Sequence, residues 1–258
     1  LKGYDAPRAQ AFFARVEEEL AAIPGVNGVT AALVPLLAGS NWGTDVVVEG
    51  FARDPDTDAN SRFNEVGTGY FSTLGVPILA GREFTLADVA TARKVAIVNE
   101  AFAKKFGLGR DAVGKRIGNG RDDALDTEIV GLVKDAKYSE VKADIPPVFF
   151  TPYRQDTTIG SINFYVRTAM APEQLLRAIP AVIKRLDPNL PIEDLKTLPQ
   201  QVQENIFLDR IVSTLSAAFA LLAALLAAVG LYGVLAYTVA QRTPEIGAQS
   251  LPSRPDPA

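Results

Sequence analysis

The chain has 258 residues and a formal net charge of −4, with 26 Lys and Arg against 30 Asp and Glu, and with neither histidine nor cysteine. This mildly acidic balance without a basic cluster argues against nucleic-acid binding. The lack of histidine removes the commonest general base and metal ligand, and the lack of cysteine removes thiol chemistry and disulfide bonds.

About 208 residues precede a long apolar stretch, which is enough for a sizeable core. Apolar side chains that recur every three or four positions predict amphipathic helices over residues 7–23 and 172–186. Shorter helices are expected over residues 69–74, 99–106 and 198–208, with Asn99 as an N-cap.

Strands are expected between these helices. Apolar and β-branched runs predict strands over residues 26–37, 44–51, 61–66, 94–98, 113–117, 128–133, 148–151, 161–167 and 191–195. Strands and short helices do not alternate regularly, so the pattern favours an α+β fold over a doubly wound sheet.

A weak internal repeat links the two ends of this region. Residues 12–32 and 175–195 both read as a helix, a turn containing proline and a strand. Two related units flanking a different middle segment would explain the repeat. The alternative is coincidence, because amphipathic helices that end at proline are common.

Residues 211–241 contain no Asp, Glu, Lys or Arg, although Arg210 and Arg242 flank them. A helix needs about 20 apolar residues to cross a bilayer core of about 30 Å, so this stretch predicts a transmembrane helix. Tyr232 and Tyr237 lie toward its far end, where aromatic rings suit the headgroup boundary. Small residues repeated every four positions would let it pack on other membrane helices. The alternative is the core helix of a soluble protein.

Residues 109–115 (GRDAVGK) match the start of a phosphate-binding loop. The next residue is Arg116, where such a loop needs Ser or Thr for magnesium. The expected helix before the motif is also the wrong context, because a strand should precede it and a helix should follow. We therefore do not expect nucleotide binding here.

Two acidic groups resemble ion or catalytic sites. Asp54, Asp56, Asp58 and Glu65 occupy positions 1, 3, 5 and 12 of a calcium loop, but Ala59 replaces the glycine that its turn requires. We expect a solvated acidic loop instead.

The other acidic group is Asp122, Asp123 and Asp126. They lie in a charged turn with no companion nucleophile, where such residues usually bond the backbone. We expect no catalytic residue, no cofactor-binding residue and no metal ligand in this chain.

Several short stretches, taken in order, carry a family resemblance. They are residues 69–77 (GYFSTLGVP), 80–84 (AGREF), 95–106 (VAIVNEAFAKKF), 113–117 (VGKRI), 128–135 (EIVGLVKD), 230–237 (GLYGVLAY) and 241–247 (QRTPEIG). Together they resemble the extracytoplasmic domain and following membrane helix of MacB-like ABC transporter permeases of the FtsX type. The longer permeases with duplicated halves are the most similar.

The resemblance implies a division of the chain. It implies an α+β periplasmic domain made of porter-like units with an inserted mixed subdomain, followed by one transmembrane helix. The expected boundaries are 1–60 for the first unit, 61–158 for the insertion, 159–208 for the second unit, 209–241 for the transmembrane helix and 242–258 for an atypical cytoplasmic tail.

The resemblance also implies a role without chemistry. A cognate ABC ATPase would move in the cytoplasm, and the membrane helix would transmit that motion to the outer domain, in efflux. The candidate ATPase-coupling residues are Arg242, Glu245, Ile246 and Gly247. Other permease helices, including those of a second copy in a homodimer, are the further partners. The expected location is the bacterial inner membrane with the large domain extracytoplasmic.

The end of the sequence departs from the family. Pro244 replaces a second arginine, and a proline-rich tail follows Gly247. The sequence begins without a signal peptide or first membrane helix, so we expect a fragment of a longer natural chain. The tail indicates a truncated or frameshifted gene as one explanation. The alternative functions are a membrane-anchored binding or sensor domain that acts without an ATPase, or an enzyme that relies on Asp122 or Asp126.

Overall fold

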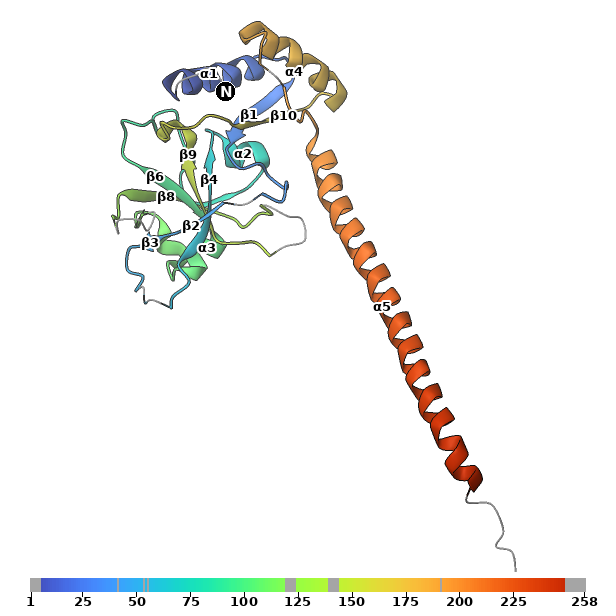
Figure 1. The fold of residues 1–258 in the computed structure, drawn as a ribbon. Coiled ribbons are helices and arrows are strands. Elements are labelled where there is room, and N and C mark those ends of the chain that lie inside the picture. The colour runs from blue at the N-terminus through green and yellow to red at the C-terminus, as the bar shows by residue number, and fades with distance from the viewer. Residues whose placement is uncertain are drawn as a thin grey trace, which may run out of the picture. The chain divides into compact units, whose positions relative to one another are not determined.

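The computed structural model describes residues 6–40, 42–52, 54, 56–118, 124–138, 144–190 and 192–248. The chain divides into two compact units, Leu1–Asn205 and Ile206–Ala258. The first unit holds the sheet and the second continues the last helix (Figure 1).

A mixed sheet forms the first unit. Its strands are β1 (Val26–Ala32), β2 (Gly43–Asp45), β3 (Val47–Val48), β4 (Asn60–Val66), β5 (Ile78–Gly81), β6 (Val95–Asn99), β7 (Arg116–Gly118), β8 (Thr127–Val133), β9 (Val148–Pro152) and β10 (Asn163–Thr168). The main order is β10-β1-β4-β9-β6-β8-β7-β3, while β2 pairs with β4 and β5 pairs with β8. The pairs β4–β9 and β6–β8 are parallel and the other pairs are antiparallel. This arrangement confirms the α+β class.

The helices are α1 (Ala6–Ala21), α2 (Tyr70–Leu74), α3 (Glu100–Lys105), α4 (Pro172–Leu186) and α5 (Leu198–Ala248), with short 3₁₀ turns η1 (Gly109–Ala112) and η2 (Tyr153–Gln155). Helices α1 and α2 pack on β1, whereas α3 packs on the central strands β6, β8 and β9. Val16 and Leu20 of α1 pack in one buried cluster with Leu175 and Ile179 of α4. The two ends of the first unit in sequence are therefore joined in one core.

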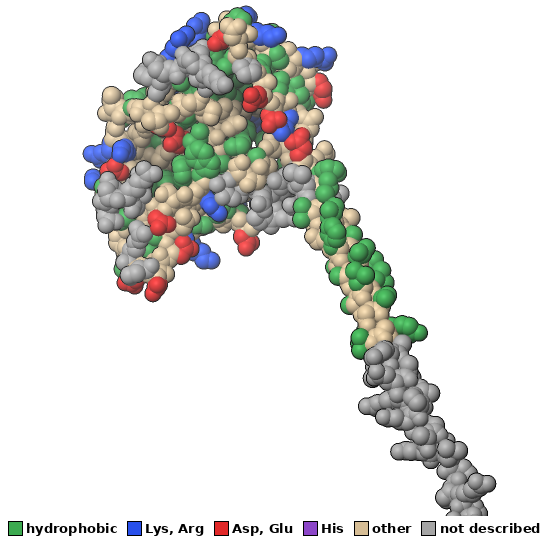
Figure 2. Space-filling model, in the orientation of Figure 1, with side chains coloured by type: hydrophobic (Ala, Val, Ile, Leu, Met, Phe, Trp, Pro, Cys, Tyr) green, Lys and Arg blue, Asp and Glu red, His purple; other side chains and the backbone are tan. Residues whose placement is uncertain are grey.

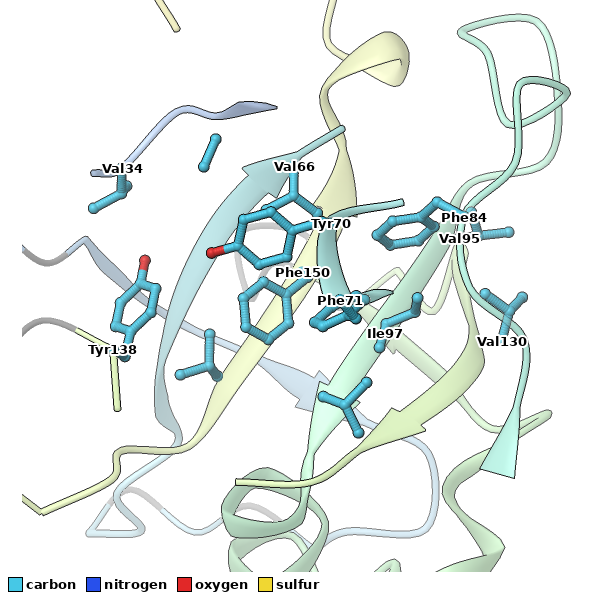
Figure 3. Packing of buried hydrophobic residues seen from close by; sticks show 13 residues of the cluster. Val34, Val66, Tyr70, Phe71, Phe84, Val95, Ile97, Val130, Tyr138 and Phe150 are labelled. Atoms are coloured by element: carbon cyan, nitrogen blue, oxygen red, sulfur yellow. The ribbon is translucent and has the colours of Figure 1, made fainter. Parts of the chain in front are cut away.

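The centre of the sheet is buried on both faces. Along β6, Val95 and Ile97 join one core while Ala96 and Val98 join another, as expected when successive side chains point to opposite faces. The first core is aromatic, and the rings of Phe71 and Phe150 meet edge to face with centroids 5.0 Å apart (Figure 3). Such pairs add about 0.5–1.5 kcal/mol beyond area burial.

Several strand predictions are wrong at their ends. The strand expected over residues 26–37 stops at Ala32, and Leu37 has a left-handed backbone with φ 52°. The strand expected over residues 44–51 is divided into β2 and β3, and a turn at Gly50 with φ 82° ends it. Isolated left-handed residues break the extended ladder in both places.

Two other strand predictions also need correction. Residues 113–115 form a turn, with Gly114 at φ 89°, and only Arg116–Gly118 pairs as a strand. Residues 192–195 form no strand, because Asp194 has φ 54° and the segment pairs with no neighbour. The proposed repeat therefore lacks the last element of its second copy.

Candidate membrane-coupling site

Residues of the motifs that carried the family resemblance define the two ends of helix α2. Gly69 and Gly75 take left-handed conformations, with φ 70° and 76°, at the two ends of α2. The carboxylate of Glu83 accepts bonds from the backbone N–H groups of Phe71 at 2.7 Å and Ser72 at 3.3 Å. A negative charge at this helix start satisfies free N–H groups and complements the helix dipole.

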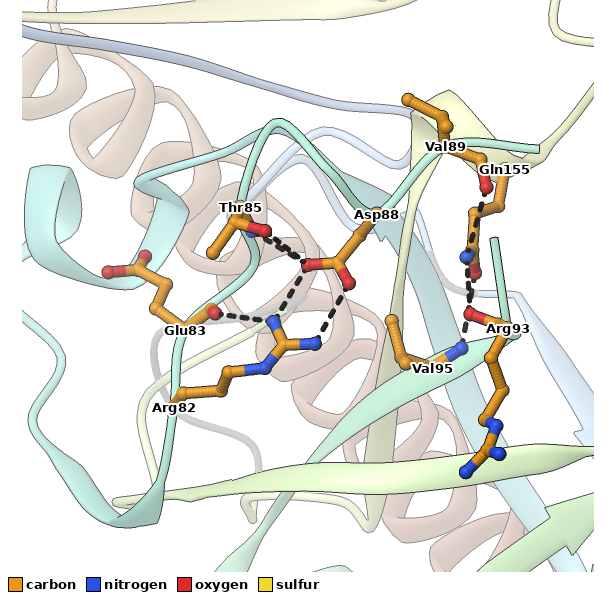
Figure 4. Close-up of polar contacts among 8 residues, drawn as sticks. All are labelled: Arg82, Glu83, Thr85, Asp88, Val89, Arg93, Val95 and Gln155. Atoms are coloured by element: carbon orange, nitrogen blue, oxygen red, sulfur yellow. Dashed lines mark hydrogen bonds and ion pairs between the residues drawn. The ribbon is translucent and has the colours of Figure 1, made fainter. Parts of the chain in front are cut away.

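A bidentate ion pair closes the loop after β5 (Figure 4). Arg82 donates from Nη1 to Asp88 Oδ2 at 2.8 Å and from Nη2 to Asp88 Oδ1 at 2.9 Å. The Thr85 N–H also donates to Asp88 Oδ2 at 2.8 Å. Burial alone would raise the pKa of Asp88, but the hydrogen bonds from Arg82 and Thr85 outweigh it and lower that pKa.

The next part of the same loop is held by Gln155. Its Nε2 donates to the carbonyl of Arg93 at 2.8 Å, and its Oε1 accepts from the Val95 N–H at 3.2 Å (Figure 4). These bonds attach the loop to the segment after β9, far away in sequence.

Asn99 performs the predicted capping role. Its Oδ1 accepts from the Phe102 N–H at 3.0 Å, so the N-cap prediction for α3 is confirmed. The same oxygen also accepts from the Val148 N–H at 2.9 Å, and Nδ2 donates to the Pro146 carbonyl at 2.9 Å. One buried side chain therefore joins α3 to the start of β9.

The segment that matches the start of a phosphate loop does not have that loop's secondary structure. Residues 109–112 form a 3₁₀ turn, and strand β7 follows Lys115 where a phosphate loop needs a helix. Lys115 Nζ lies 3.5 Å from Glu49 Oε1. This local structure differs from that of a phosphate loop, and the absence of nucleotide binding at this motif stays a prediction.

The predicted acidic loop does not gather its carboxylates. Asp58 pairs with Lys105 at 2.7 Å, while Glu65 lies inside β4 and is half-buried. Asp126 pairs with Lys94. Asp122 and Asp123 lie outside the described residues. Within the described ranges, no cluster of three or more acidic side chains is arranged to hold a metal ion.

Sequence reasoning missed a buried polar cluster beneath α1. Glu17 of α1, Glu65 of β4 and the turn residues Tyr153, Arg154 and Asp156 form it. One signal was available: Glu17 follows Val16 and precedes Leu20 by three positions, which puts a charge on the apolar face of the helix. Glu65 similarly shares a strand face with Phe63.

Helix α5 begins with a reciprocal cap. The Thr197 N–H donates to Gln200 Oε1 at 2.8 Å, and the Gln200 N–H donates to Thr197 Oγ1 at 3.3 Å. Gln201 Nε2 donates to the Leu36 carbonyl at 3.0 Å, so the first turn is bonded to the loop after β1. Lys196 contacts Asp194 at 3.5 Å and Glu204 at 2.7 Å.

Further along α5, residues Ile211–Leu235 are long and apolar enough to cross a membrane. Their mean hydropathy is 2.4, and no part of the segment is buried inside the fold. Hydrophobic side chains follow the described face of this helix, whereas charged side chains are scattered over the first unit (Figure 2). A helix with this composition and no buried face is unsuited to water.

Arg242, Glu245, Ile246 and Gly247 lie in the last turns of α5. Their side chains are outside the described part of the structure, so their coupling role stays a prediction.

Comparison with known proteins gives one family match. The sequence profile of a family described as MacB-like periplasmic core domain matches residues 3–182, which span all ten strands and most of α4. No curated protein sequence matches the chain.

Solved structures resemble the chain at low identity. The periplasmic region of MacB from Actinobacillus actinomycetemcomitans is 17% identical, with a TM-score of 0.48, covering 67% of this chain and 73% of that chain. The extracellular domain of the noncanonic ABC-type transporter YknZ from Gram-positive bacteria is 16% identical, with a TM-score of 0.45, covering 68% and 82%.

Proposed function

The chain belongs to the MacB-like periplasmic core domain family of ABC transporter permeases, and on that premise we propose that it transmits the motion of a cytoplasmic ATPase to an extracytoplasmic domain, in efflux. The family is one of transporter domains and not of enzymes. Membrane association and partnership with an ABC ATPase are general properties of the family.

The observation that carries the proposal is the continuity of α5. One helix of 51 residues runs from Leu198 to Ala248. At 1.5 Å per residue it is about 77 Å long, far more than a bilayer core of about 30 Å. Its first turns belong to the first unit, where Gln201 bonds the Leu36 carbonyl, and its apolar segment follows in the same helix. An unbroken helix transmits displacement, whereas a flexible linker would absorb it.

We propose the following membrane topology and contacts for the chain. The first unit lies on the extracytoplasmic side of the bacterial inner membrane, and the C-terminal end of α5 lies in the cytoplasm. Arg242, Glu245, Ile246 and Gly247 are the proposed contact with the ATPase. The alanine-rich face of α5 packs on other permease helices, including those of a second copy.

We also retain the proposed division of the first unit. Residues 1–60 and 159–208 form the two porter-like units, and residues 61–158 are the insertion. Antiparallel pairing of β1 with β10 and the shared core of α1 and α4 support the grouping of the flanking parts in one subdomain. The insertion carries most of β4 and all of β5 to β9, and it supplies most residues of the two central core clusters.

The test interrupts α5 between Asn205 and Ile206, the boundary of the two units. One variant receives seven Gly and Ser residues, and a matched variant receives seven helix-forming Ala, Glu and Lys residues, about two turns, which preserve the facing of the helix. Both are reconstituted in vesicles with the ATPase that copurifies with the chain from its native membranes.

Hydrogen exchange of the sheet is then compared with and without ATP. We expect an ATP-dependent change in the wild type and in the helical insertion, and none in the flexible insertion. If no ATPase copurifies, or if the flexible insertion responds like the wild type, the transmission proposal is wrong. The membrane-anchored binding domain would then be the better account.

A further inference from the structure

The loop after β1 connects the start of α5 with strands from both parts of the first unit. Residues 33–37, here called the bridging segment, follow β1 and belong to no helix or strand. The side chain of Val34 is buried in the aromatic core, and Leu36 packs against the same core (Figure 3). The bridging segment is therefore part of the interior of the first unit and not a free surface loop.

Leu36 is bonded at both ends of its backbone. Its carbonyl accepts from Gln201 Nε2 in the first turn of α5 at 3.0 Å, and its N–H donates to the hydroxyl of Tyr165 on β10 at 2.8 Å. One residue thus stands between the helix and the last strand of the sheet. A displacement of the first turn of α5 reaches Tyr165 through two hydrogen bonds.

The neighbouring residues of the bridging segment are bonded to β4. Asn64, which is fully buried, accepts from the Val34 N–H through Oδ1 and donates to the Val34 carbonyl through Nδ2, both at 2.9 Å. The Leu33 N–H also donates to the Glu65 carbonyl at 2.8 Å. Buried hydrogen bonds of this kind are costly to break, so β4 follows the bridging segment when the segment moves.

The backbone of the bridging segment is stiff between these bonds. Pro35 fixes its own φ and restricts Val34 to extended conformations. Leu37 has a left-handed backbone with φ 52°, and its N–H donates to the Tyr138 carbonyl at 2.9 Å. A residue other than glycine keeps such a conformation only where its surroundings hold it in place. A stiff segment passes on a displacement that a flexible loop would absorb.

The covalent connection between α4 and α5 offers a second route into the first unit. Residues 192–195 of this connection are exposed, and they form no strand. A stretch without a ladder of hydrogen bonds or a buried face opens easily, so it absorbs a displacement of α5. The route through Leu36 is hydrogen-bonded and enters the core directly, which makes it the stiffer of the two.

We propose that displacement of α5 enters the sheet at Leu36. Movement of Gln201 displaces the Leu36 carbonyl, and Tyr165 passes this displacement to β10. Asn64 passes it to β4 through Val34, so the flanking part and the insertion move together. Gln201, Tyr165 and Asn64 are therefore positioning residues for the transmission. The source of the displacement rests on the function proposed above, whereas the hydrogen-bonded joint at Leu36 exists without it.

The first test needs no ATPase and uses a double-mutant cycle on the full chain in detergent micelles. Gln201→Leu removes the donor to the Leu36 carbonyl, and Tyr165→Phe removes the acceptor of the Leu36 N–H. Residues that share a bonded partner affect stability non-additively. We expect Tyr165→Phe to lower the folding equilibrium constant about fivefold in the wild type and less than about twofold in Gln201→Leu, as measured by chemical unfolding.

Two control variants carry the same chemical changes. Gln203→Leu alters an exposed residue of the same helix, and it should be additive with Tyr165→Phe. Tyr70→Phe removes a buried hydroxyl that has no hydrogen-bond partner in the described part of the structure, and it should be additive with Gln201→Leu. Additivity of Gln201→Leu with Tyr165→Phe overturns the proposal.

Hydrogen exchange replaces the cycle if the double variant does not fold. The peptide that contains residues 33–37 should then exchange at least about tenfold faster in Gln201→Leu than in the wild type, because the segment has lost its bond to α5. Unchanged exchange of this peptide overturns the proposal.

The second test places Gln201→Leu in the vesicles of the transmission test. Hydrogen exchange at β4 and β10 should change with ATP in the wild type and in Gln203→Leu, but not in Gln201→Leu. A merely structural role of Gln201 would leave the ATP-dependent change in place, and that result overturns the proposal. If the wild type itself shows no ATP-dependent change, the transmission proposal is wrong, and the cycle alone decides whether the joint at Leu36 exists.

Discussion

Asp88 in the loop after β5 and Glu65 on β4 are both withdrawn from water at least in part, but their pKa values shift in opposite directions. Asp88 accepts two bonds from Arg82 and two from Thr85, and despite burial its pKa is lowered. Burial of Glu65, together with the charge of Asp156, instead raises its pKa to about 8. Donors offset the burial of Asp88, whereas Glu65 Oε2 is buried without a hydrogen-bond partner and burial raises the pKa of Glu65.

A spectroscopic probe is available for testing this contrast. The single tryptophan, Trp42, packs on Phe63 with ring centroids 5.9 Å apart, so its fluorescence reports unfolding of the first unit. The predictions below use this signal in the detergent-solubilised full chain.

The largest effect on stability is expected from Gly81→Ala, which alters the backbone immediately before the loop from Arg82 to Asp88. Gly81 has φ 75°, and an added Cβ would lie 2.1 Å from the Val130 carbonyl oxygen. Backbone strain and this overlap together should cost more than about 3 kcal/mol or prevent folding. Gly75→Ala is the control, because Gly75 has φ 76° with open space around it and should cost only about 1 kcal/mol. Equal losses in the two variants would contradict the packing argument.

Asp88→Asn should be the next largest. The substitution removes the charge that Arg82 and Thr85 bond and leaves the guanidinium without its carboxylate, which should cost about 1–3 kcal/mol at neutral pH. Because the pKa of Asp88 is lowered, its contribution is present above the ordinary value of 3.8 and is lost as pH falls through the native pKa. Chemical unfolding at pH 7 and at pH 3 should show the difference shrinking in acid. A constant difference would show that charge is not the cause.

Glu65 should give the opposite pH dependence of the free energy of unfolding. Glu65 binds its proton more tightly in the native state, so its contribution is complete below 4.5 and is lost as pH rises toward about 8. Allowing for partial exposure, wild-type stability should fall by about 1–2 kcal/mol across this range. In Glu65→Gln the fall should disappear. If stability rises with pH in the wild type while the slope of Glu65→Gln is unchanged, Glu65 is ionised in the native state.

Glu17→Gln should have the smallest effect. Glu17 is paired with Arg154, but burial still raises its pKa, so the charge gains little from the pair. The neutral amide should change stability by less than about 1 kcal/mol at pH 7. The same acid-to-amide change at Asp88 should cost more. Asp88→Asn should therefore unfold at a lower denaturant concentration than Glu17→Gln, and the reverse order would contradict the comparison.

Local pattern predicted much of this fold. The continuous apolar run of β6 and the apolar spacing of α1 and α4 predicted the element types, and Asn99 was predicted correctly as a cap. The errors fall where one backbone angle interrupts an apolar run. Asp194 and Leu37 are left-handed although neither is glycine, and no composition rule marks them in advance.

The polar interior could not be read in the same way. Glu17 and Arg154 are 137 positions apart in the sequence. Glu65 lies near the residues that follow β9 only because β4 pairs in parallel with β9. Side-chain spacing along a chain indicates which face a residue occupies, not which distant segment covers that face. The family resemblance agreed with the fold class predicted from the pattern of elements, but it gave no residue of this cluster.

The position of β1 also governs the order in which the first unit can assemble. Its long ladder is with β10, whose Asn163 stands 131 positions after Ala32, whereas its pairing with β4 is limited to Ala32 and Val66. During synthesis β1 therefore stays largely unpaired until nearly the whole first unit has left the ribosome. Such a high contact order slows folding and exposes a strand edge meanwhile. A nascent chain of this kind would benefit from a chaperone until β10 arrives.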